Sequence, residues 1–284
     1  MENKREIKKI GIVLSGGLAR GVAQLAFCDE LIKNVCIDKF GFFSGSSIGA
    51  LNAYSLSSQK SAALLDFYLS LEIGSIFQFR RALKNNLFGK AFSVAEGESL
   101  IAPTYVSATR LFPIDLYYFY LNKMGRNDLT KVLNLSMAFP ILNGPKLFKG
   151  HFYLDGGAAN NVPILPADYH DLDMLIIVHC YPKYYPPEKE IRENRILIDV
   201  DCTLSLGKGI TPFSYDKTSL REMALEGRRS GKEFTNFIFS DFDYENVRRR
   251  CFEYTNKNLE RRKEKSAGML ALVDYANAIF SFKY

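Results

Sequence analysis

A serine with a glycine two residues away on each side is the residue of this chain best suited to covalent chemistry. The pentapeptide is Gly45-Ser46-Ser47-Ile48-Gly49, which matches the pattern G-x-S-x-G. In acyl hydrolases the serine of this pattern lies on a sharp turn between a strand and a helix, and its hydroxyl projects at the sheet edge. The pattern therefore indicates Ser47 as a nucleophile if a strand precedes it and a helix follows.

The neighbouring residues have the required composition. Residues 39–43 are short and aromatic, which is typical of a buried strand, and residues 48–53 begin a helix of small and apolar residues. The alternative is an ordinary glycine-rich turn, because such a pattern arises by chance in about one chain of this length in ten. The order of strand, turn and helix favours the nucleophile.

An earlier strand and helix predict what lies beside Ser47. Residues 8–14 have the pattern of a buried strand and residues 20–34 that of a helix leading to the strand at 39–43. This β-α-β arrangement makes the two strands parallel, so the loops that follow them emerge at the same sheet edge. The loop at residues 15–21 should therefore be a spatial neighbour of Ser47.

That loop has the features of an oxyanion hole. Gly16, Gly17 and Leu18 offer consecutive backbone N–H groups between a strand and a helix N-terminus, where free amides and the helix dipole both favour negative charge. Losing one such donor typically lowers turnover about 100- to 1000-fold. A dinucleotide site is disfavoured, because G-x-G-x-x-G requires glycine at the position of Leu18 and no suitably spaced acidic residue follows. We expect no cofactor.

A serine nucleophile also needs a base, and Asp155 is the candidate. It ends an apolar strand at residues 151–154 and precedes Gly156 and Gly157, which would let serine and substrate approach closely. An aspartate can act directly as general base if partial burial raises its pKa. A simple Asp-Gly turn is the alternative.

A conventional Ser-His-Asp triad is a second possibility for the base. It would combine Ser47 and Asp155 with His170 or His179 in the chain order of such hydrolases. None of the three histidines lies in a recognisable catalytic context. The triad remains open as an alternative on the residues alone.

The three separated motifs together resemble those of the patatin-like phospholipases. The motifs are the glycine loop with Arg20-Gly21, the serine pentapeptide, and Asp155-Gly156-Gly157, and the similarity includes SMAFPILNGP at 136–145 and DGGAANNVP at 155–163. The resemblance covers residues 8–180 and fades in the C-terminal part. It implies an α/β fold, a three-layer α/β/α sandwich around a mainly parallel sheet.

The resemblance also implies roles and substrates. Ser47 would be the nucleophile and Asp155 the proton acceptor of a Ser-Asp dyad, and an acyl-serine intermediate would form on phospholipids or acylglycerols. The amides of the glycine loop would form the oxyanion hole, and no metal is implied. The supporting residues are Arg20, Gly21, Gly45, Gly49, Gly156 and Gly157. Phospholipase A and lysophospholipase activities are not distinguished.

Leu18 departs from the family pattern, which often has glycine there. If the position needs a positive φ, the strain is about 1 kcal/mol or more. We expect activity to persist with an altered rate or acyl specificity. The alternative is a catalytically weak, lipid-binding protein of the same fold.

Length and composition predict one globular domain over residues 1–284, with a motif-bearing core at 8–180 and a largely helical part at 181–284. The charged start and the lack of a long apolar run indicate neither a signal peptide nor a transmembrane segment. Five cysteines without a C-x-x-C pair argue against disulfides and zinc. We expect a cytoplasmic protein, peripheral at membranes; the sequence does not indicate an oligomeric state.

The net charge of +6 is concentrated in a few basic clusters, for which solvated surface is the alternative to a binding role. Residues 76–90 are basic and aromatic without an acidic residue. Our hypothesis is a lid or a patch that meets anionic lipid, and the alternative is a helix that packs its Phe and Leu face on the core. Nucleic-acid binding rests on charge alone and is not expected.

Overall fold

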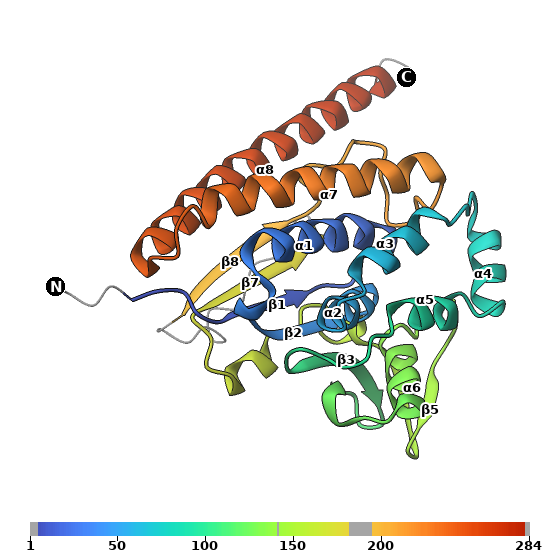
Figure 1. Cartoon of the computed structure of the whole chain (residues 1–284). Helices are drawn as coiled ribbons and strands as arrows, with labels where there is room; N and C mark the ends of the chain where they lie inside the picture. The colour runs from blue at the N-terminus through green and yellow to red at the C-terminus, as the bar shows by residue number, and fades with distance from the viewer. Residues whose placement is uncertain (1–4, 141, 182–194, 282–284) are drawn as a thin grey trace.

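The computed structural model describes residues 5–140, 142–181 and 195–281. An eight-stranded sheet lies at the centre of the fold (Figure 1). The strand order is β5-β6-β3-β2-β1-β7-β8, with β4 paired to β3. The strands are β1 (Ile10–Leu14), β2 (Phe40–Ser46), β3 (Thr104–Leu111), β4 (Asp115–Tyr120), β5 (Lys146–Phe148), β6 (His151–Asp155), β7 (Met174–His179) and β8 (Ile196–Asp201). From β3 to β8 the neighbouring strands are parallel, whereas β4, β5 and β6 make antiparallel pairs.

The described helices occupy the regions between these strands and the end of the chain. They are α1 (Gly21–Val35), α2 (Ile48–Ser57), α3 (Ser61–Leu69), α4 (Ile76–Lys84), α5 (Leu87–Ala95), α6 (Arg126–Ser136), α7 (Lys217–Ile238) and α8 (Tyr244–Ser281). The first β-α-β unit has the predicted order, and β2 continues three residues beyond the expected strand to Ser46. The small residues of this extension lie directly before the turn at Ser47.

Alternating apolar residues give the sheet two buried faces. In β7, Met174, Ile176 and Val178 join one core, whereas Leu175 and Ile177 join the other. Apolar residues of α1, α2 and α7 belong to the first core, and residues 162–172 with a short 3₁₀ helix (Leu165–Tyr169) cover the second face. The expectation of an α/β sandwich around a mainly parallel sheet is therefore confirmed.

Helix α7 packs closely on α1 through two of its glycines (Figure 1). A Cβ atom at Gly227 would lie 2.4 Å from the carbonyl oxygen of Ala23, and one at Gly231 would lie 2.7 Å from that of Phe27. These spacings allow no larger residue without a shift of backbone. Helix α7, which comes late in the chain, thus completes the same core as the N-terminal β-α-β unit.

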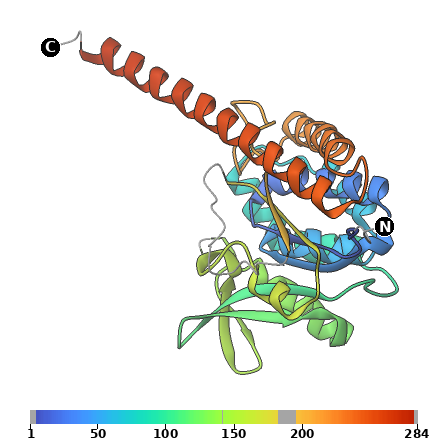
Figure 2. The ribbon, with the colours of Figure 1, turned by 90° about the vertical axis from the view of Figure 1, so that its left-hand side faces the viewer.

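Helix α8 continues beyond the rest of the protein toward the C-terminus (Figure 2). Near its middle, Arg262 forms an ion pair of 2.8 Å with Asp199 of β8. In the described part of the chain, no helix is both long enough and apolar enough to cross a membrane.

The direction of β6 differs from that of its neighbours and has a consequence for the site. Strand β3 pairs with β2 as far as Ser107 but continues to Leu111, and the antiparallel β6 pairs with this overhang. Asp155, at the end of β6, lies opposite Ala108. The antiparallel strand therefore ends at the sheet edge where β2 leads into Ser47.

Candidate active site

The backbone at Ser47 adopts the sharp turn that its sequence pattern predicts. Ser47 has φ 55° and ψ −129°, a conformation that costs a non-glycine residue about 1–3 kcal/mol. A Cβ atom at Gly45 would lie 2.1 Å from the Gly49 carbonyl oxygen, and one at Gly49 would lie 2.4 Å from that of Ser15. The two glycines of the pentapeptide are required because backbone atoms occupy the space of a side chain.

Ser47 and Asp155 are in direct contact. The Ser47 hydroxyl donates a 2.6 Å hydrogen bond to Oδ2 of Asp155, and the backbone N–H of Gly157 donates a 2.8 Å hydrogen bond to Oδ1. One carboxylate oxygen thus faces the serine while the other is fixed by its own loop. This geometry suits proton transfer from a hydroxyl to a carboxylate.

Burial tunes Asp155 for such a role. The residue is 4% exposed. Burial raises the pKa of Asp155 from 3.8 to about 6, against the opposing effect of the hydrogen bonds from Ser47 and Gly157. A general base works best with a pKa near the working pH, because it is then ionised and still has appreciable proton affinity.

The histidines lie elsewhere in the part of the chain that the structure describes. The His170 ring is 3.3 Å from the Tyr105 hydroxyl, and the buried His179 contacts Asp199 at 2.7 Å and Arg262 at 3.2 Å. His151 is exposed at the start of β6. None of these histidine contacts is with Ser47, so they do not support the Ser-His-Asp alternative.

The glycine loop lies over Ser47. A Cβ atom at Gly16 would lie 2.7 Å from Cβ of Ser47, and one at Gly17 would lie 2.4 Å from Cβ of Cys180. Leu18 has φ 51°, which lies in the left-handed region. This is the positive φ at which we expected strain in a residue other than glycine. Glycine at the first two positions thus permits the close approach, and Leu18 carries the strain.

One of the three loop amides already has an acceptor. The N–H of Gly16 donates to Oδ1 of Asn161 at 3.1 Å, and Nδ2 of Asn161 donates back to the Gly16 carbonyl at 3.3 Å. The amides of Gly17 and Leu18 donate to no protein acceptor among the described residues. These two amides are therefore the ones available to an oxyanion.

The supporting residues hold the three motifs together. A Cβ atom at Gly21 would lie 2.7 Å from the side chain of Ile48, and one at Gly156 would lie 2.4 Å from the Ser107 hydroxyl. The Arg20 guanidinium donates to the Ile210 carbonyl at 3.1 Å, so it anchors the loop to the segment after β8. In this position Arg20 holds the backbone of the glycine loop in place.

Two further residues were not selected from the sequence. The hydroxyl of Ser136, at the end of α6, accepts a 3.1 Å hydrogen bond from the N–H of Ser47. Asn161, in the loop that follows Asp155, links this loop to the glycine loop through its two hydrogen bonds with Gly16. Both residues lie in the segments 136–145 and 155–163 that carried the resemblance, which was the available signal.

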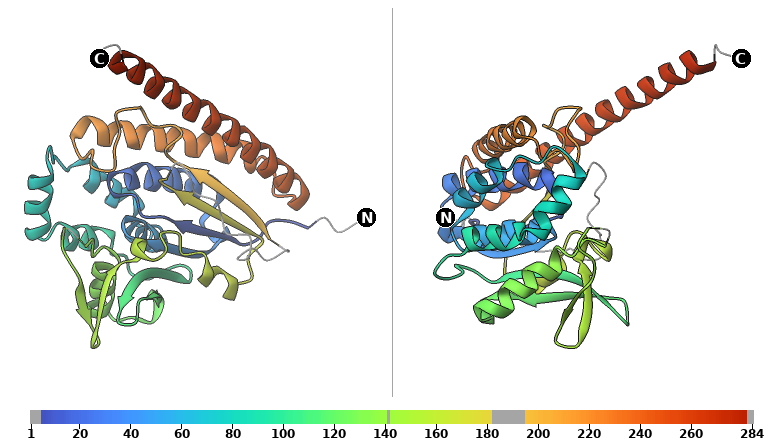
Figure 3. Two further views of the ribbon diagram at one scale, coloured as in Figure 1. Left: turned by 180° about the vertical axis from the view of Figure 1, so that it is seen from behind. Right: turned by 90° about the vertical axis from the view of Figure 1, so that its right-hand side faces the viewer.

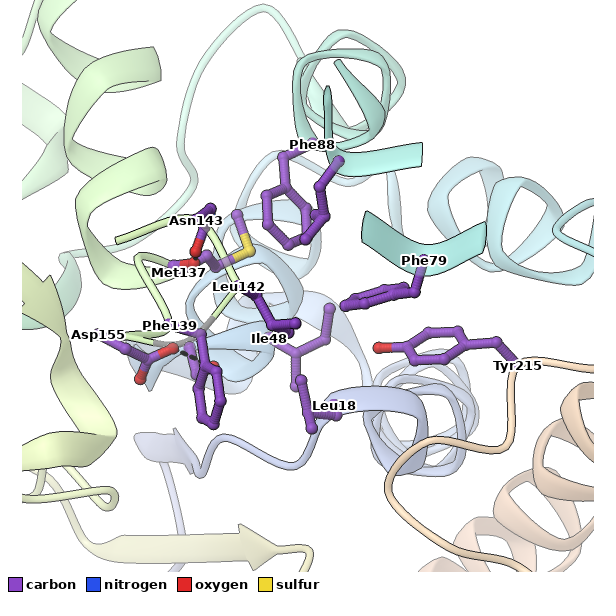
Figure 4. A pocket seen from close by; sticks show the side chains of 12 residues that line it. Leu18, Ile48, Phe79, Phe88, Met137, Phe139, Leu142, Asn143, Asp155 and Tyr215 are labelled. Carbon is purple, nitrogen blue, oxygen red and sulfur yellow. Dashed lines mark hydrogen bonds between the residues drawn. The ribbon is translucent and has the colours of Figure 1, made fainter. Parts of the chain in front are cut away.

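An apolar pocket adjoins the dyad (Figure 4). Phe79 of α4, Phe139 and Tyr215 converge on it from separate segments, and the other lining residues are Leu18, Ser47, Ile48, Leu83, Phe88, Met137, Leu142, Asn143 and Asp155. Such a lining suits a hydrocarbon chain. The free volume is about 20 Å³, so these side chains must separate to admit an acyl chain.

Comparison with known proteins assigns the chain to a family. A family model described as patatin-like phospholipase matches residues 12–168, which is more than half of the chain. The chain belongs to the patatin-like phospholipase family. The expected family is confirmed. No protein of curated description matches the chain.

Solved structures with similar folds include three proteins of low sequence identity. VipD from Legionella pneumophila is 12% identical, with a TM-score of 0.40 over 80% of this chain and 68% of its own. Human GIVD cytosolic phospholipase A2 is 10% identical, with a TM-score of 0.46 over 90% and 60%. The ExoU–SpcU complex of Pseudomonas aeruginosa gives 16%, a TM-score of 0.45, and coverage of 100% and 66%. This chain thus spans about two thirds of the chains it matches.

Proposed function

We propose that this protein hydrolyses fatty-acyl ester bonds of phospholipids or acylglycerols, with Ser47 as nucleophile and Asp155 as general base. The observation that carries the proposal is the 2.6 Å hydrogen bond from Ser47 to the buried Asp155, directly below the glycine loop. The apolar pocket supports the choice of a lipid substrate, because it adjoins the nucleophile and is lined mainly by hydrocarbon and aromatic side chains.

The acylation step follows from this geometry. Asp155 Oδ2 takes the proton of the Ser47 hydroxyl while Oγ attacks the ester carbonyl carbon. The amides of Gly17 and Leu18 donate to the oxyanion that forms. Collapse of the tetrahedral intermediate breaks the bond to the leaving alcohol, which takes the proton from Asp155 and leaves an acyl-serine.

The second step regenerates the enzyme. Asp155 accepts a proton from a water molecule, and the oxygen of this water attacks the acyl carbonyl carbon. The intermediate then expels Ser47 Oγ, which recovers its proton from Asp155, and the fatty acid departs. One carboxylate thus serves as base and acid in turn, as microscopic reversibility requires.

A digest of mixed lipids tests the proposal. Wild type, Ser47→Ala and Asp155→Ala are incubated with phospholipids and acylglycerols, and the released fatty acids are measured by mass spectrometry. We expect release by the wild type and a loss of at least 100-fold in both variants, within the range of a general base or nucleophile. Retained release by Asp155→Ala contradicts the dyad. Loss in His170→Ala or His179→Ala alone favours the triad, and no release by the wild type favours a lipid-binding protein.

A further inference from the structure

Helix α4 has two faces of opposite character. Phe79 and Leu83 line the apolar pocket, and Figure 4 shows the Phe79 ring directed into it. Phe77, Arg80, Arg81 and Lys84 fall within about 100° of one another on the opposite side of the helix, since successive residues are about 100° apart. All four are exposed, and Phe77 is 77% exposed. The sequence alternatives of a surface patch and a core-packing helix therefore describe two faces of the same helix.

The position of α4 relates its outer face to the site. The helix lies at the margin of the protein away from the N-terminus, and two opposite views show it on the outside (Figures 1 and 3). Phe79 stacks on Tyr215 with ring centroids 4.8 Å apart, and both rings line the pocket beside Ser47. A surface that meets the outer face of α4 is thus one helix diameter from the pocket lining.

The charge on this segment selects the kind of surface. Residues 76–90 contain Arg80, Arg81, Lys84 and Lys90 and no acidic residue. An exposed aromatic side chain among basic residues on one face of a helix is the pattern that binds a bilayer interface, with the ring in the headgroup boundary and the cations near anionic lipid. We propose that the outer face of α4, formed by Phe77, Arg80, Arg81 and Lys84, docks on an anionic lipid surface and brings the pocket beside it.

This inference rests on the proposed function only for its biological purpose, because vesicle binding is measured without turnover. Co-sedimentation with phosphatidylcholine vesicles, with and without phosphatidylglycerol, uses the Ser47→Ala protein so that no lipid is consumed. Arg81→Gln/Lys84→Gln removes two charges from the outer face. Arg248→Gln/Lys257→Gln removes two charges from exposed positions of α8 and is the matched control.

We expect Ser47→Ala to bind vesicles that contain phosphatidylglycerol more tightly than neutral ones. A basic residue near an anionic surface contributes roughly a factor of five, so the α4 variant should bind about 30-fold more weakly and the α8 control within about threefold of the parent. Phe77→Ala should weaken binding further. Equal losses in both double variants, or equal binding to neutral vesicles, overturn the proposal. Tighter binding of RNA or polyglutamate than of anionic vesicles also overturns it.

Hydrolysis measured in proteins that retain Ser47 separates the two proposals. Arg81→Gln/Lys84→Gln should retain hydrolysis of a soluble short-chain ester and lose hydrolysis of phosphatidylglycerol vesicles by at least tenfold. If no form of the protein hydrolyses either substrate, the proposed function fails while the binding measurement still decides the docking surface. If the α4 variant hydrolyses vesicles as fast as the wild type, the docking surface is refuted and the hydrolase is retained.

Discussion

The pKa of Asp155 makes a quantitative prediction for the pH dependence of hydrolysis. The base must be ionised to accept a proton from Ser47, so activity falls as pH falls through the pKa of about 6. About nine tenths of the enzyme is ionised at about pH 7 and about one tenth at about pH 5, which gives a tenfold decrease. At the ordinary value of 3.8 the same change of pH would leave activity almost constant.

The assay is kcat/KM for a soluble short-chain ester, because this quantity reports the ionisation of the free enzyme. A histidine base would give an inflection in a similar range, so His170→Ala is the necessary companion variant. We expect it to retain the inflection near 6. A profile that stays flat down to about pH 5, or one that loses its inflection in His170→Ala, refutes the assignment of Asp155 as the base.

Three other perturbations follow from the contacts. Because burial raises the folded-state pKa of Asp155, stability is lost as the pH rises from 3.8 through about 6, and the full cost is present at neutral pH. Asp155→Asn should therefore stabilise the inactive protein by about 3 kcal/mol at neutral pH, and in thermal unfolding this gain should shrink as the pH falls toward 3.8. Asn161→Ala should lower kcat about 10- to 100-fold with little change in KM, because the two loops lose their link; a change confined to KM would contradict this. Gly227→Ala should destabilise by about 1–3 kcal/mol in chemical denaturation, whereas Gly125→Ala, where a Cβ meets open space, should not; equal effects would contradict the close packing of α7 on α1.

Local sequence patterns predicted the parts of the site that depend on one segment at a time. The strand before Ser47 and the helix after it have periodicities that a short window contains. Gly45 and Gly49 are explained by atoms of the same turn and of the adjacent β1 loop. The proximity of the loop at 15–21 followed from the parallel crossover alone.

Features that depend on residues far apart in the sequence could not be predicted from these local patterns. The antiparallel direction of β6 follows from the overhang of β3, whose length no local periodicity sets. The hydrogen bonds of Asn161 to Gly16 join residues 145 positions apart. For α4, the spacing of its side chains was compatible with either surface or core, and only its packing beside Tyr215 assigns the two faces.

The central claim is that Asp155 activates Ser47. A fluorophosphonate probe reports this directly, because it forms a covalent adduct with an activated serine. Wild type, Ser47→Ala and Asp155→Ala are treated with the probe, and the modified peptide is identified by mass spectrometry. We predict one adduct on Ser47 in the wild type, none in Ser47→Ala, and labelling at least 100-fold slower in Asp155→Ala. Labelling of Ser47 at an unchanged rate in Asp155→Ala would contradict the account.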